Sequence, residues 1–408
     1  MTTPKDKPMR ILTIAGLWPD STRPNHGIFV ENRLSRVQAT GEASIRVLTP
    51  VPWFPFRGAR WGEYAKFAAV PDRETRGAIT ADHPRYLMLP KIGARGQPDA
   101  VYRSLSRRAR RLIREEGAFD LVDAQYFYPE GPAAARLADE LDLPLVVTAR
   151  GSDVSEIPLV HPFARRRILE TAARAERIVT VAAALKSALV DLGAEGAKIR
   201  VLRNGVDLEA FRPPEDRAKA RARWGIEGDA PLLVSVGALV ERKGHHLTLE
   251  ALAGLPGARL LVAGAGPEKA ALEAQIKALG LEGRARLLGP VPHKDLALLY
   301  GAAEASILAS SREGWANVLL ESMACGAPAV ATRVWGAPEV VAAPEAGRLA
   351  PERSAASIRS AVADLLAAPP DRAATRAYAE RFSWEETVSG TLAVLREAIA
   401  ARADLKAA

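Results

Sequence analysis

Cysteine is almost absent from this sequence, and long apolar runs are missing from it. The single cysteine, Cys325, leaves no second thiol in the chain for a disulfide, as is typical of a reducing compartment. Cys325 lies in an apolar stretch and is predicted to be a small buried side chain. No stretch has the roughly 20 consecutive apolar residues that a membrane-spanning helix needs. Residues 1–10 contain no apolar signal-peptide segment, so we expect a cytoplasmic protein.

Complete motifs for metal or dinucleotide binding are also lacking. His245 and His246 are adjacent, so they do not face one ion, and no further ligand lies at a metal-site spacing. Gly264 and Gly266 form a G-x-G sequence after an apolar strand, but the third glycine of a dinucleotide-binding loop is missing. The loop after the first strand has no such motif either. The sequence therefore predicts no metal and no cofactor, and it argues against an NAD-dependent oxidoreductase.

What the chain does contain is typical of a globular protein with two domains. Its 408 residues are 48% hydrophobic and 25% charged, and they exceed the size of one ordinary core. Short apolar strands alternate with helical patterns along the chain, which predicts an α/β fold with parallel sheets.

The net charge of +8 is unevenly distributed. Residues 1–205 contain 32 basic and 23 acidic side chains and carry +9, whereas the remainder carries −1. Arginines crowd two predicted helices, at 107–114 and 165–167. Three interpretations are open: a solvated face, an anionic membrane surface and a nucleic-acid surface. No nucleic-acid motif accompanies the charge, so we expect no nucleic-acid partner.

The most informative segment, Ser310–Thr332, is predicted to fold as loop, helix, turn and strand. Apolar residues from Val318 to Ala324 recur at helical spacing. Asn317 is predicted to be the N-cap, because its side chain can accept a hydrogen bond from the first helical turn. Gly326 fits the left-handed residue that ends many helices.

Two carboxylates, Glu313 and Glu321, frame the start of this predicted helix. A helix N-terminus offers unpaired N–H groups and a partial positive charge, so an anion fits there. The two carboxylates would then bind hydroxyl groups of a sugar and a ribose attached to the anion. The alternative is that Glu313 is a solvated loop acid and Glu321 an acid favoured by the helix dipole.

A second loop, after the apolar strand at 232–236, combines glycine with basic side chains. Gly237 is followed by Arg242 and Lys243, directly before a predicted helix. A strand, a glycine, basic residues and a helix start together predict phosphate binding. The alternative for Arg242 is a solvated loop charge.

Three strands in the first half of the chain, at 10–17, 119–124 and 143–149, predict one ligand-facing edge. The carboxyl ends of parallel strands share an edge, and ligands bind there in doubly wound sheets. The residues of interest that follow these strands are His26, Gly27, Tyr126, Arg150 and Asp153. Taken alone, His26 is better explained as a loop residue that has no specific role.

The string E-G-W-A-N-V-L-L-E-S-M-A-C-G-A-P-A-V-A-T, residues 313–332, resembles the E-x7-E region of retaining glycosyltransferases of the GT4 type. The likeness includes the glycine after the first glutamate, E-x-M-A-x-G and G-x-P, and it extends over nearly the whole chain. N-G-V-D at 204–207 and G-x-G-P at 264–267 are further examples. Residues 24–34, PNHGIFVENRL, resemble the branch that makes bacterial cell-surface polysaccharides of the teichuronic-acid type.

The resemblance implies a GT-B fold, in which two Rossmann-like domains with parallel sheets face each other across a cleft. We expect residues 1–210, with a last helix at 384–408, to form the acceptor domain. Residues 211–383 are expected to form the donor domain, with a linker at 211–216. The implied enzyme is metal-independent and moves a hexose from a nucleotide diphosphate sugar to a hydroxyl of a glycan, a glycolipid or a small acceptor. Peripheral attachment to the inner face of the membrane is an expectation of the same kind.

The resemblance also implies roles for individual residues. Glu313 contacts the transferred sugar, Glu321 the ribose and Lys243 the diphosphate, with Arg242 and Arg150 as further cations at the reaction centre. The other donor-binding positions are Gly27, Gly237, Gly264, Gly266, Val291, Gly314, Trp315, Ala316 and Asn317. The acceptor-binding positions are His26, Tyr126 and Asp153.

Residues 53–98 are rich in aromatic residues, proline, glycine and arginine, and are predicted to form an irregular loop. The family binds its acceptors on the first domain, so one interpretation of this loop is an acceptor surface. The other is an Ω-loop packed on its own aromatic side chains.

Two positions depart from the family pattern. Arg150 stands where most relatives have a histidine that contacts the donor sugar, and arginine is not a base at neutral pH. It can still bind a phosphate or sugar oxygen. Ala238 stands at the arginine position of G-R-L-x-x-x-K-G, so Arg242 is predicted to replace that arginine. Two rival functions remain compatible with the fold, a nucleotide-sugar epimerase and a non-catalytic polysaccharide-binding protein.

Overall fold

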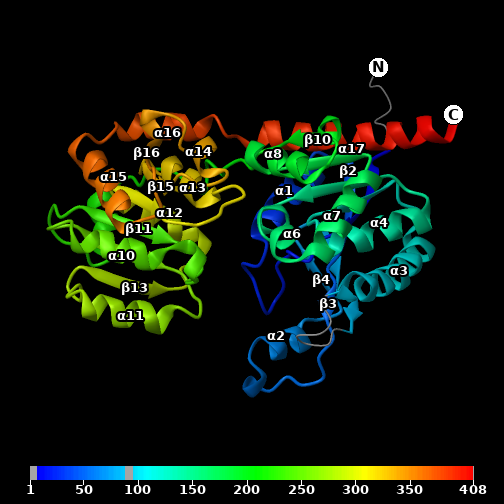
Figure 1. The fold of residues 1–408 in the computed structure, drawn as a ribbon, viewed down its shortest axis with the longest axis horizontal. Coiled ribbons are helices and arrows are strands. Elements are labelled where there is room, and N and C mark those ends of the chain that lie inside the picture. Colours follow the sequence, from blue (N-terminus) through cyan, green and yellow to red (C-terminus); the bar gives the residue numbers. More distant parts are fainter. Residues whose placement is uncertain (1–6, 88–94, 408) are drawn as a thin grey trace. The chain divides into compact units, whose positions relative to one another are not determined.

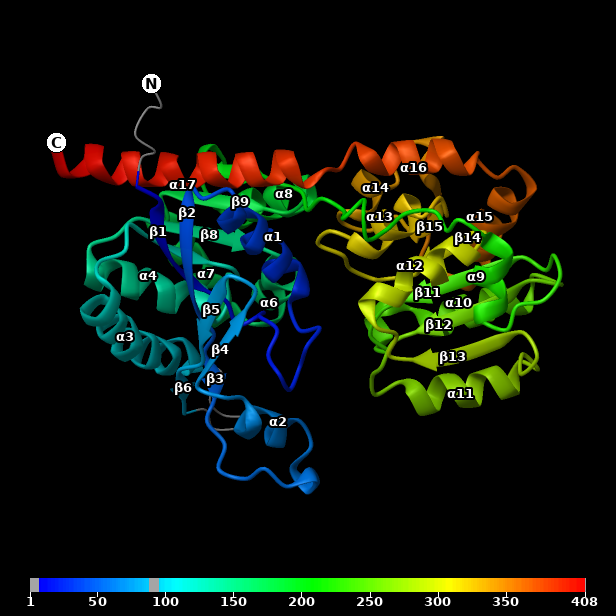
Figure 2. The ribbon, with the colours of Figure 1, turned by 180° about the vertical axis from the view of Figure 1, so that it is seen from behind.

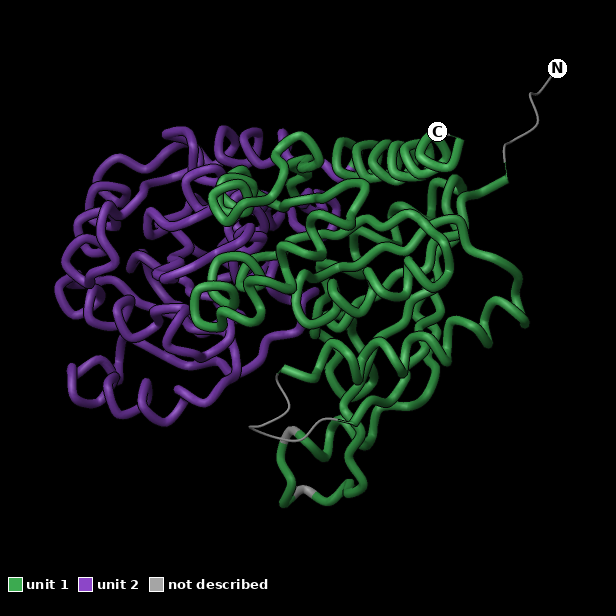
Figure 3. Tube along the Cα trace, turned by 45° about the vertical axis from the view of Figure 1, so that its right-hand side comes forward, with its two compact units in different colours: residues 1–203, 385–408 green, residues 204–384 purple. Residues whose placement is uncertain are grey.

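The computed structural model describes residues 7–87 and 95–407, which fold into two compact units (Figure 3). Unit 1 comprises Met1–Arg203 and Glu385–Ala408, and unit 2 comprises Asn204–Trp384. The chain therefore leaves unit 1 after Arg203 and returns to it at Glu385. Within the described residues, no helix is both long and apolar enough to cross a membrane.

Unit 1 is built on an eight-stranded sheet with the order β10-β9-β8-β7-β1-β2-β5-β4 (Figure 1). Neighbouring strands are parallel except for β4 and β5, which form an antiparallel hairpin. The order reverses between β1 and β7, so the switch point of the sheet lies between these strands. The strands are β1 (Met9–Ile14), β2 (Ala43–Leu48), β4 (Arg73–Arg76), β5 (Ile79–Asp82), β7 (Leu121–Ala124), β8 (Leu145–Ala149), β9 (Arg177–Thr180) and β10 (Ile199–Val201).

The helices of unit 1 connect these strands and bury the apolar residues of the sheet. β7 and β8 are buried along their whole length, as expected for parallel strands covered on both faces. A short parallel pair, β3 (Val51–Pro52) with β6 (Arg85–Tyr86), lies near α2 in both views (Figures 1 and 2). The helices are α1 (Ile28–Ala39), α2 (Glu63–Ala69), α3 (Gln97–Glu116), α4 (Glu130–Leu141), α5 (Ser152–Ser155), α6 (Ile157–Val160), α7 (Pro162–Arg174) and α8 (Ala183–Leu192).

Unit 2 contains a six-stranded parallel sheet with the order β13-β12-β11-β14-β15-β16. This is the Rossmann order, and its switch point lies between β11 and β14. The strands are β11 (Leu232–Val236), β12 (Arg259–Ala263), β13 (Ala285–Gly289), β14 (Ala305–Leu308), β15 (Ala329–Thr332) and β16 (Gly347–Ala350). The helices are α9 (Arg217–Arg223), α10 (His245–Ala253), α11 (Lys269–Ala278), α12 (His293–Ala302), α13 (Asn317–Ala324), α14 (Ala337–Val340), α15 (Ala355–Ala367) and α16 (Arg372–Glu380).

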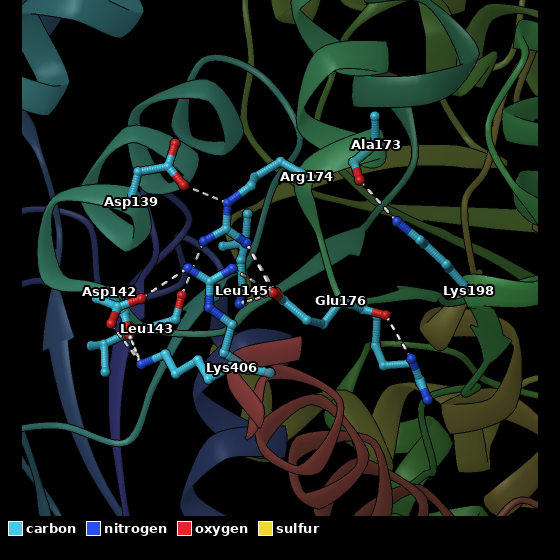
Figure 4. Close-up of polar contacts among 11 residues, drawn as sticks. Asp139, Asp142, Leu143, Leu145, Ala173, Arg174, Glu176, Lys198 and Lys406 are labelled. Carbon is cyan, nitrogen blue, oxygen red and sulfur yellow. Dashed lines mark hydrogen bonds and ion pairs between the residues drawn. The ribbon is translucent and has the colours of Figure 1, made fainter. Parts of the chain in front are cut away.

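The last helix, α17 (Trp384–Ala407), completes the core of unit 1. Leu392, Leu395 and Ala398 are buried in the same apolar cluster as Ile11 and Val30. Its polar face is held by ion pairs, which Figure 4 shows around Asp142 and Glu176.

In this network, Lys406 Nζ lies 2.6 Å from a carboxylate oxygen of Asp142, and Arg402 contacts the same side chain at 3.0 Å. Arg174 joins Asp139 to Glu176, and the Glu176 carboxylate accepts the backbone N–H of Leu145 at 2.7 Å. The end of α17 is therefore tied to the loop between α4 and β8.

Three local predictions are wrong. Asn317 is the first residue of α13 and Ala316 is its cap, without a side-chain capping bond. The side-chain amide oxygen of Asn317, Oδ1, instead accepts from the Asn204 side-chain amide at 3.2 Å. The predicted linker at 211–216 lies within unit 2, because the Phe211 ring is buried against His293 and Tyr300. Gly326, with φ of 77°, ends α13 as predicted, and Cys325 is buried.

The segment at 53–98 is only partly irregular, which corrects the third prediction. It contains α2 and the β4–β5 hairpin, whose turn includes Gly77 with φ of 55°. The aromatic part does pack on itself, since Phe54 contacts Trp61 and Tyr64 with ring centroids 5.6 and 5.2 Å apart. Residues 88–94 lie outside the described residues.

Candidate functional site

The switch point of unit 2 brings together the two loops that sequence analysis singled out. The loop after β11 contributes Lys243, and the loop after β14 contributes Glu313. Lys243 Nζ lies 2.7 Å from Glu313 Oε1, and the Ser310 hydroxyl donates to the same oxygen at 2.5 Å. Both charged side chains are largely buried, with 16% and 9% exposed. Solvent screens this pair less than it would screen an ion pair on the surface.

Close backbone packing beneath this pair requires glycine. Gly264 has a φ of 158°, and a Cβ there would overlap the carbonyl oxygen of Gly237. Gly244 has a φ of 69°, and its Cβ would overlap the carbonyl oxygen of Ala309, before the Glu313 loop. Gly266 faces the Leu239 backbone in the same way. By contrast, a Cβ on Gly237 would meet only the Lys243 side chain, at 3.5 Å.

Arg242 lies between the same two loops, but its contacts are with backbone. Its guanidinium donates to the carbonyl of Arg312 at 3.1 Å, and its own carbonyl accepts from Ser311 N–H at 2.9 Å. These bonds fix the Glu313 loop against the Lys243 loop. Arg242 was predicted to contact phosphate in place of the family arginine, whose position Ala238 occupies here. That role stays a prediction.

His245, beside Lys243, is a buried neutral imidazole. It lies 2.9 Å from the Ser235 hydroxyl and 3.2 Å from the Ala238 carbonyl, and burial lowers its pKa to about 4. The imidazole therefore connects β11 to the start of the loop that contains Lys243. Within the described ranges, 7–87 and 95–407, no three His, Cys, Asp or Glu side chains are grouped to hold a metal ion.

The second carboxylate of the E-x7-E motif, Glu321, lies on α13 opposite the start of α12. Its carboxylate is 3.4 Å from His293 Nε2, and this contact raises the pKa of His293. Burial, followed by the charge of Glu321, raises the pKa of the fully buried Tyr300. Glu321 thus faces a histidine and a tyrosine of one neighbouring helix.

The other predicted donor positions around α13 play different structural parts. The Trp315 indole N–H donates to the Asn204 carbonyl at 3.0 Å, and its ring is buried. Ala316, directly before α13, is buried, whereas Gly314 and, after β13, Val291 are half-buried. The Trp315 side chain therefore packs within unit 2, and the donor-binding roles of Trp315, Gly314, Ala316 and Val291 stay predictions.

In unit 1, His26 and Gly27 lie in the loop after β1. Gly27 has a φ of 73° and caps α1, and a Cβ there would overlap the Leu17 backbone. The His26 ring is 3.2 Å from the Gly16 carbonyl, and burial, followed by the charge of Arg23, lowers its pKa. This loop is therefore held by a glycine and a predominantly neutral histidine.

Arg150 and Asp153 follow β8 and are both buried. The Asp153 carboxylate accepts backbone N–H groups of Phe127, Arg150 and Gly151 at 3.1, 3.0 and 2.7 Å, so it shapes the turn. Its pKa is raised to about 6 by burial.

The Arg150 guanidinium donates to Gln125, while its Nε and one terminal nitrogen have no hydrogen-bond partner. Burial lowers the pKa of Arg150 to about 10. The Tyr126 hydroxyl, from the loop after β7, is 2.6 Å from the Ser152 hydroxyl. The donor role of Arg150 and the acceptor roles of His26, Tyr126 and Asp153 stay predictions.

Three of the arginines of α3, which the sequence singled out for their charge, have carboxylate partners. Arg108 lies 2.6 Å from Asp82, and Arg110 lies 2.5 Å from Glu140. Arg111 pairs with Glu115 on the same helix at 2.6 Å. These pairs favour the interpretation of a solvated face for this helix.

Sequence analysis missed three polar residues of the two switch points. Ser310 and His293 contact the predicted carboxylates directly, and Glu130 lies at the start of α4 against Gly16. Glu130 follows the strand β7 and a proline in sequence, which is the position of a ligand-facing loop. Its burial depends on packing between loops far apart in the chain, which no local pattern reports.

Two family models match the chain over successive stretches. Residues 67–210 match the model of Glycosyltransferase Family 4, and residues 216–382 match the model of Glycosyl transferases group 1. The D-inositol 3-phosphate glycosyltransferases of Mycobacterium bovis and Mycobacterium tuberculosis are 33% identical over 317 residues. That alignment covers 70% of this chain and 63% of those proteins, so the chain matches less than two thirds of their length.

Solved glycosyltransferase structures share the fold. Sucrose-phosphate synthase from Thermosynechococcus elongatus has a TM-score of 0.79 at 19% identity, covering 96% of this chain and all of that one. HepE from Anabaena, solved with UDP and glucose, has a TM-score of 0.70 at 21% identity, covering 94% of this chain and 98% of that one. The fold is GT-B, and the family models support a glycosyltransferase similar to family 4.

Proposed function

We propose that this chain, a GT-B protein similar to the family 4 glycosyltransferases, is a retaining enzyme that moves a sugar from a nucleotide diphosphate sugar to a hydroxyl acceptor. The observation that carries the proposal is the buried Lys243–Glu313 pair at the switch point of unit 2. Ligands of doubly wound sheets bind at such points, and a lysine above close-packed glycines is suited to a diphosphate.

The pair gives each residue a part in the reaction. Lys243 would stabilise the negative charge that develops on the departing diphosphate, as a fixed cation in a water-poor site does. The Glu313 carboxylate would accept hydrogen bonds from hydroxyl groups of the transferred sugar and keep the Lys243 side chain in place. The Glu321 carboxylate, which lies opposite His293, would accept a hydrogen bond from a ribose hydroxyl.

The proposed chemistry breaks the bond between the anomeric carbon and the diphosphate oxygen. The acceptor oxygen bonds to that carbon on the same face, and its proton moves to the departing phosphate oxygen. The anomeric configuration is therefore kept. The acceptor class fits the synthesis of bacterial surface polysaccharide or glycolipid, which rests on the sequence resemblance.

Glu313→Gln tests the proposal. We expect turnover of the preferred donor among UDP, GDP and ADP sugars to fall about 100-fold, because the substitution removes the charge that holds Lys243. Glu241→Gln is the matched control, since Glu241 is exposed and contacts Arg353 instead. Unchanged turnover in Glu313→Gln would contradict the role of Glu313, and an inverted anomer in the product, read by NMR, would contradict retention.

Absence of turnover with every donor would favour the rival function of a polysaccharide-binding protein. Conversion of the nucleotide sugar to its epimer without transfer would favour the epimerase. Product analysis after incubation with and without a hydroxyl acceptor distinguishes these outcomes.

A further inference from the structure

Unit 1 has a cavity at its own switch point, beside the loops that follow β1 and β7. The cavity has a volume of about 430 Å³, within the range of small-molecule sites. Its walls combine aromatic rings and prolines with a few polar side chains. They are Gly16, Arg23, Pro50, Pro52, Tyr64, Phe67, Tyr86, Gln97, Val101, Pro129 and Glu130.

Glu130 is the unusual member of this set. Its side chain is buried, Oε2 has no hydrogen-bond partner, and a Cβ on Gly16 would overlap Oε1. Among the described residues we find no ion pair to this carboxylate. Burial raises its pKa to about 7, and the neighbouring charge of Asp153 adds to the effect. A buried acceptor oxygen without a partner carries a desolvation cost that a ligand hydroxyl would remove.

The aromatic wall is held in place from behind. Arg85 donates to the carbonyls of Phe67 and Val70 at the end of α2, the first at 2.5 Å. Arg23 lies over the Phe67 ring, 5.2 Å from its centroid. Tyr86 accepts from the Gln97 amide at 3.0 Å. The Phe67 and Tyr86 rings are therefore held in place by contacts with neighbouring side chains.

The charges of the cavity favour a neutral ligand over an anionic one. Of the described residues that line it, Arg23 is the one cation, and its guanidinium is bound to Asp20 at 2.6 and 3.0 Å. An ionised Glu130 would repel a phosphate. Aromatic faces and an unpaired carboxylate oxygen suit a ring with apolar C–H faces and hydroxyl edges.

We propose that this cavity binds a neutral, hydroxyl-bearing ring of the acceptor, a sugar or a cyclitol, with the Glu130 carboxylate accepting a hydrogen bond from one of its hydroxyl groups and Tyr64 and Phe67 contacting its face. This inference rests on the proposed glycosyltransferase function, because it assigns the acceptor of that reaction. It names Glu130 as a binding residue and leaves the donor site in unit 2 unchanged.

Saturation-transfer NMR on the full-length protein with UDP tests the inference. The probes are methyl α-glucoside, methyl α-mannoside, methyl α-galactoside and myo-inositol, with myo-inositol 1-phosphate as the anionic counterpart. We expect at least one neutral ring to bind. Glu130→Gln and Tyr64→Ala should each weaken that binding about tenfold, through loss of a charged hydrogen bond or of an aromatic face.

The matched control is Trp53→Ala, because Trp53 is an exposed aromatic residue of the same segment that does not line the cavity. The Trp53→Ala variant should bind the ring with the same affinity as the wild type. Ring binding that survives both Glu130→Gln and Tyr64→Ala would overturn the inference. So would binding of the phosphate ester alone, or of no ring at all.

UDP binding, measured in the same samples, separates this inference from the proposed function. Glu130→Gln and Tyr64→Ala should bind UDP as the wild type does. If UDP and the other nucleotides fail to bind the wild type, the proposed function fails, while the ring signals still report on the cavity. Normal UDP binding with unchanged ring binding in both variants would overturn the acceptor site alone.

Discussion

The two switch points of this molecule carry a buried glutamate each, and the two glutamates differ in their partners. Glu313 in unit 2 accepts from a lysine at 2.7 Å and a serine at 2.5 Å. Glu130 in unit 1 has an oxygen without a partner and a pKa raised to about 7. A charge-paired carboxylate beside a lysine suits a charged ligand, whereas an unpaired one suits hydroxyl groups. The same sheet topology thus supports two different kinds of site.

The largest expected effect comes from removing the cation of the unit 2 switch point. Lys243→Ala should lower kcat/KM for the donor about 100- to 1000-fold, the usual loss when one fixed charge-stabilising group is deleted. Steady-state kinetics on the preferred nucleotide sugar measures it. Lys269→Ala is the control, because Lys269 is exposed and pairs only with Glu273 on its own helix. Equal activity of the two variants would contradict a role for Lys243 in stabilising the departing diphosphate.

The carboxylate of the unit 1 switch point should reveal its burial through stability. The pKa of Glu130 is raised from 4.5 to about 7, so the folded state binds its proton more tightly than the unfolded state does. The free energy of unfolding should therefore fall as pH rises from about 4.5 to 7, by about 3 kcal/mol from this group. Glu130→Gln should remove this fall and stabilise the protein at pH 8 by a similar amount.

Denaturant titrations of the wild type and Glu130→Gln at pH 4.5 and pH 8 measure this difference. The two proteins should differ much less at the lower pH, where Glu130 is protonated in the folded state and about half protonated in the unfolded state. Glu176→Gln provides the contrast, because the Glu176 carboxylate is also buried but contacts Arg174 at 3.1 Å. A Glu130→Gln variant that loses stability at pH 8 would show that its carboxylate has a partner.

Glycines beneath the unit 2 pair should respond unequally to alanine. Gly264→Ala should cost about 1–3 kcal/mol of stability or more, because its Cβ overlaps backbone at a φ of 158°. Gly237→Ala should cost less, since its Cβ meets only the flexible Lys243 side chain at 3.5 Å. Thermal unfolding compares the two. Equal losses would mean that the loops do not approach as closely as described.

The smallest expected effect is at the edge of the donor site. Glu321 raises the pKa of His293, so its contribution to stability is present at low pH and is lost as pH rises through that pKa. Glu321→Gln should lower the pKa of His293, which NMR titration of the imidazole measures. Because His293 is one-third exposed, the effect on stability should be small. An unchanged pKa would contradict the contact between α12 and α13.

Sequence patterns predicted the α/β class and the residues that lie in loops after buried strands, including Glu313, Lys243 and Gly27. Strand alternation and glycine position are local signals, so they survive without knowledge of packing. Several partners were beyond prediction, because Asn204 and Tyr64 acquire their roles from loops far apart in the chain. Ser310 is only three residues from Glu313, but a serine at this spacing is too common to predict the bond. Asn317 illustrates the limit, since asparagine is a good capping residue, but its side-chain oxygen here accepts a hydrogen bond from Asn204 instead.

Glu130 is a second residue whose environment could not be predicted from the sequence. Its position after β7 marked it as a loop residue, but its pKa and its unpaired oxygen arise from contact with the loop after β1. The roles of Arg150 and Arg242 also depend on such contacts, because both side chains bind neighbouring groups of the protein.

The closure of unit 1 by α17 has a consequence for synthesis on the ribosome. Residues 204–384 form a continuous unit that can complete its sheet while the chain is still being made. The first stretch of unit 1 is made before unit 2, yet its apolar cluster lacks Leu392 and Leu395 until α17 has emerged. The first half of the nascent chain therefore lacks part of its apolar core until a helix that follows all of unit 2 in the sequence has been made.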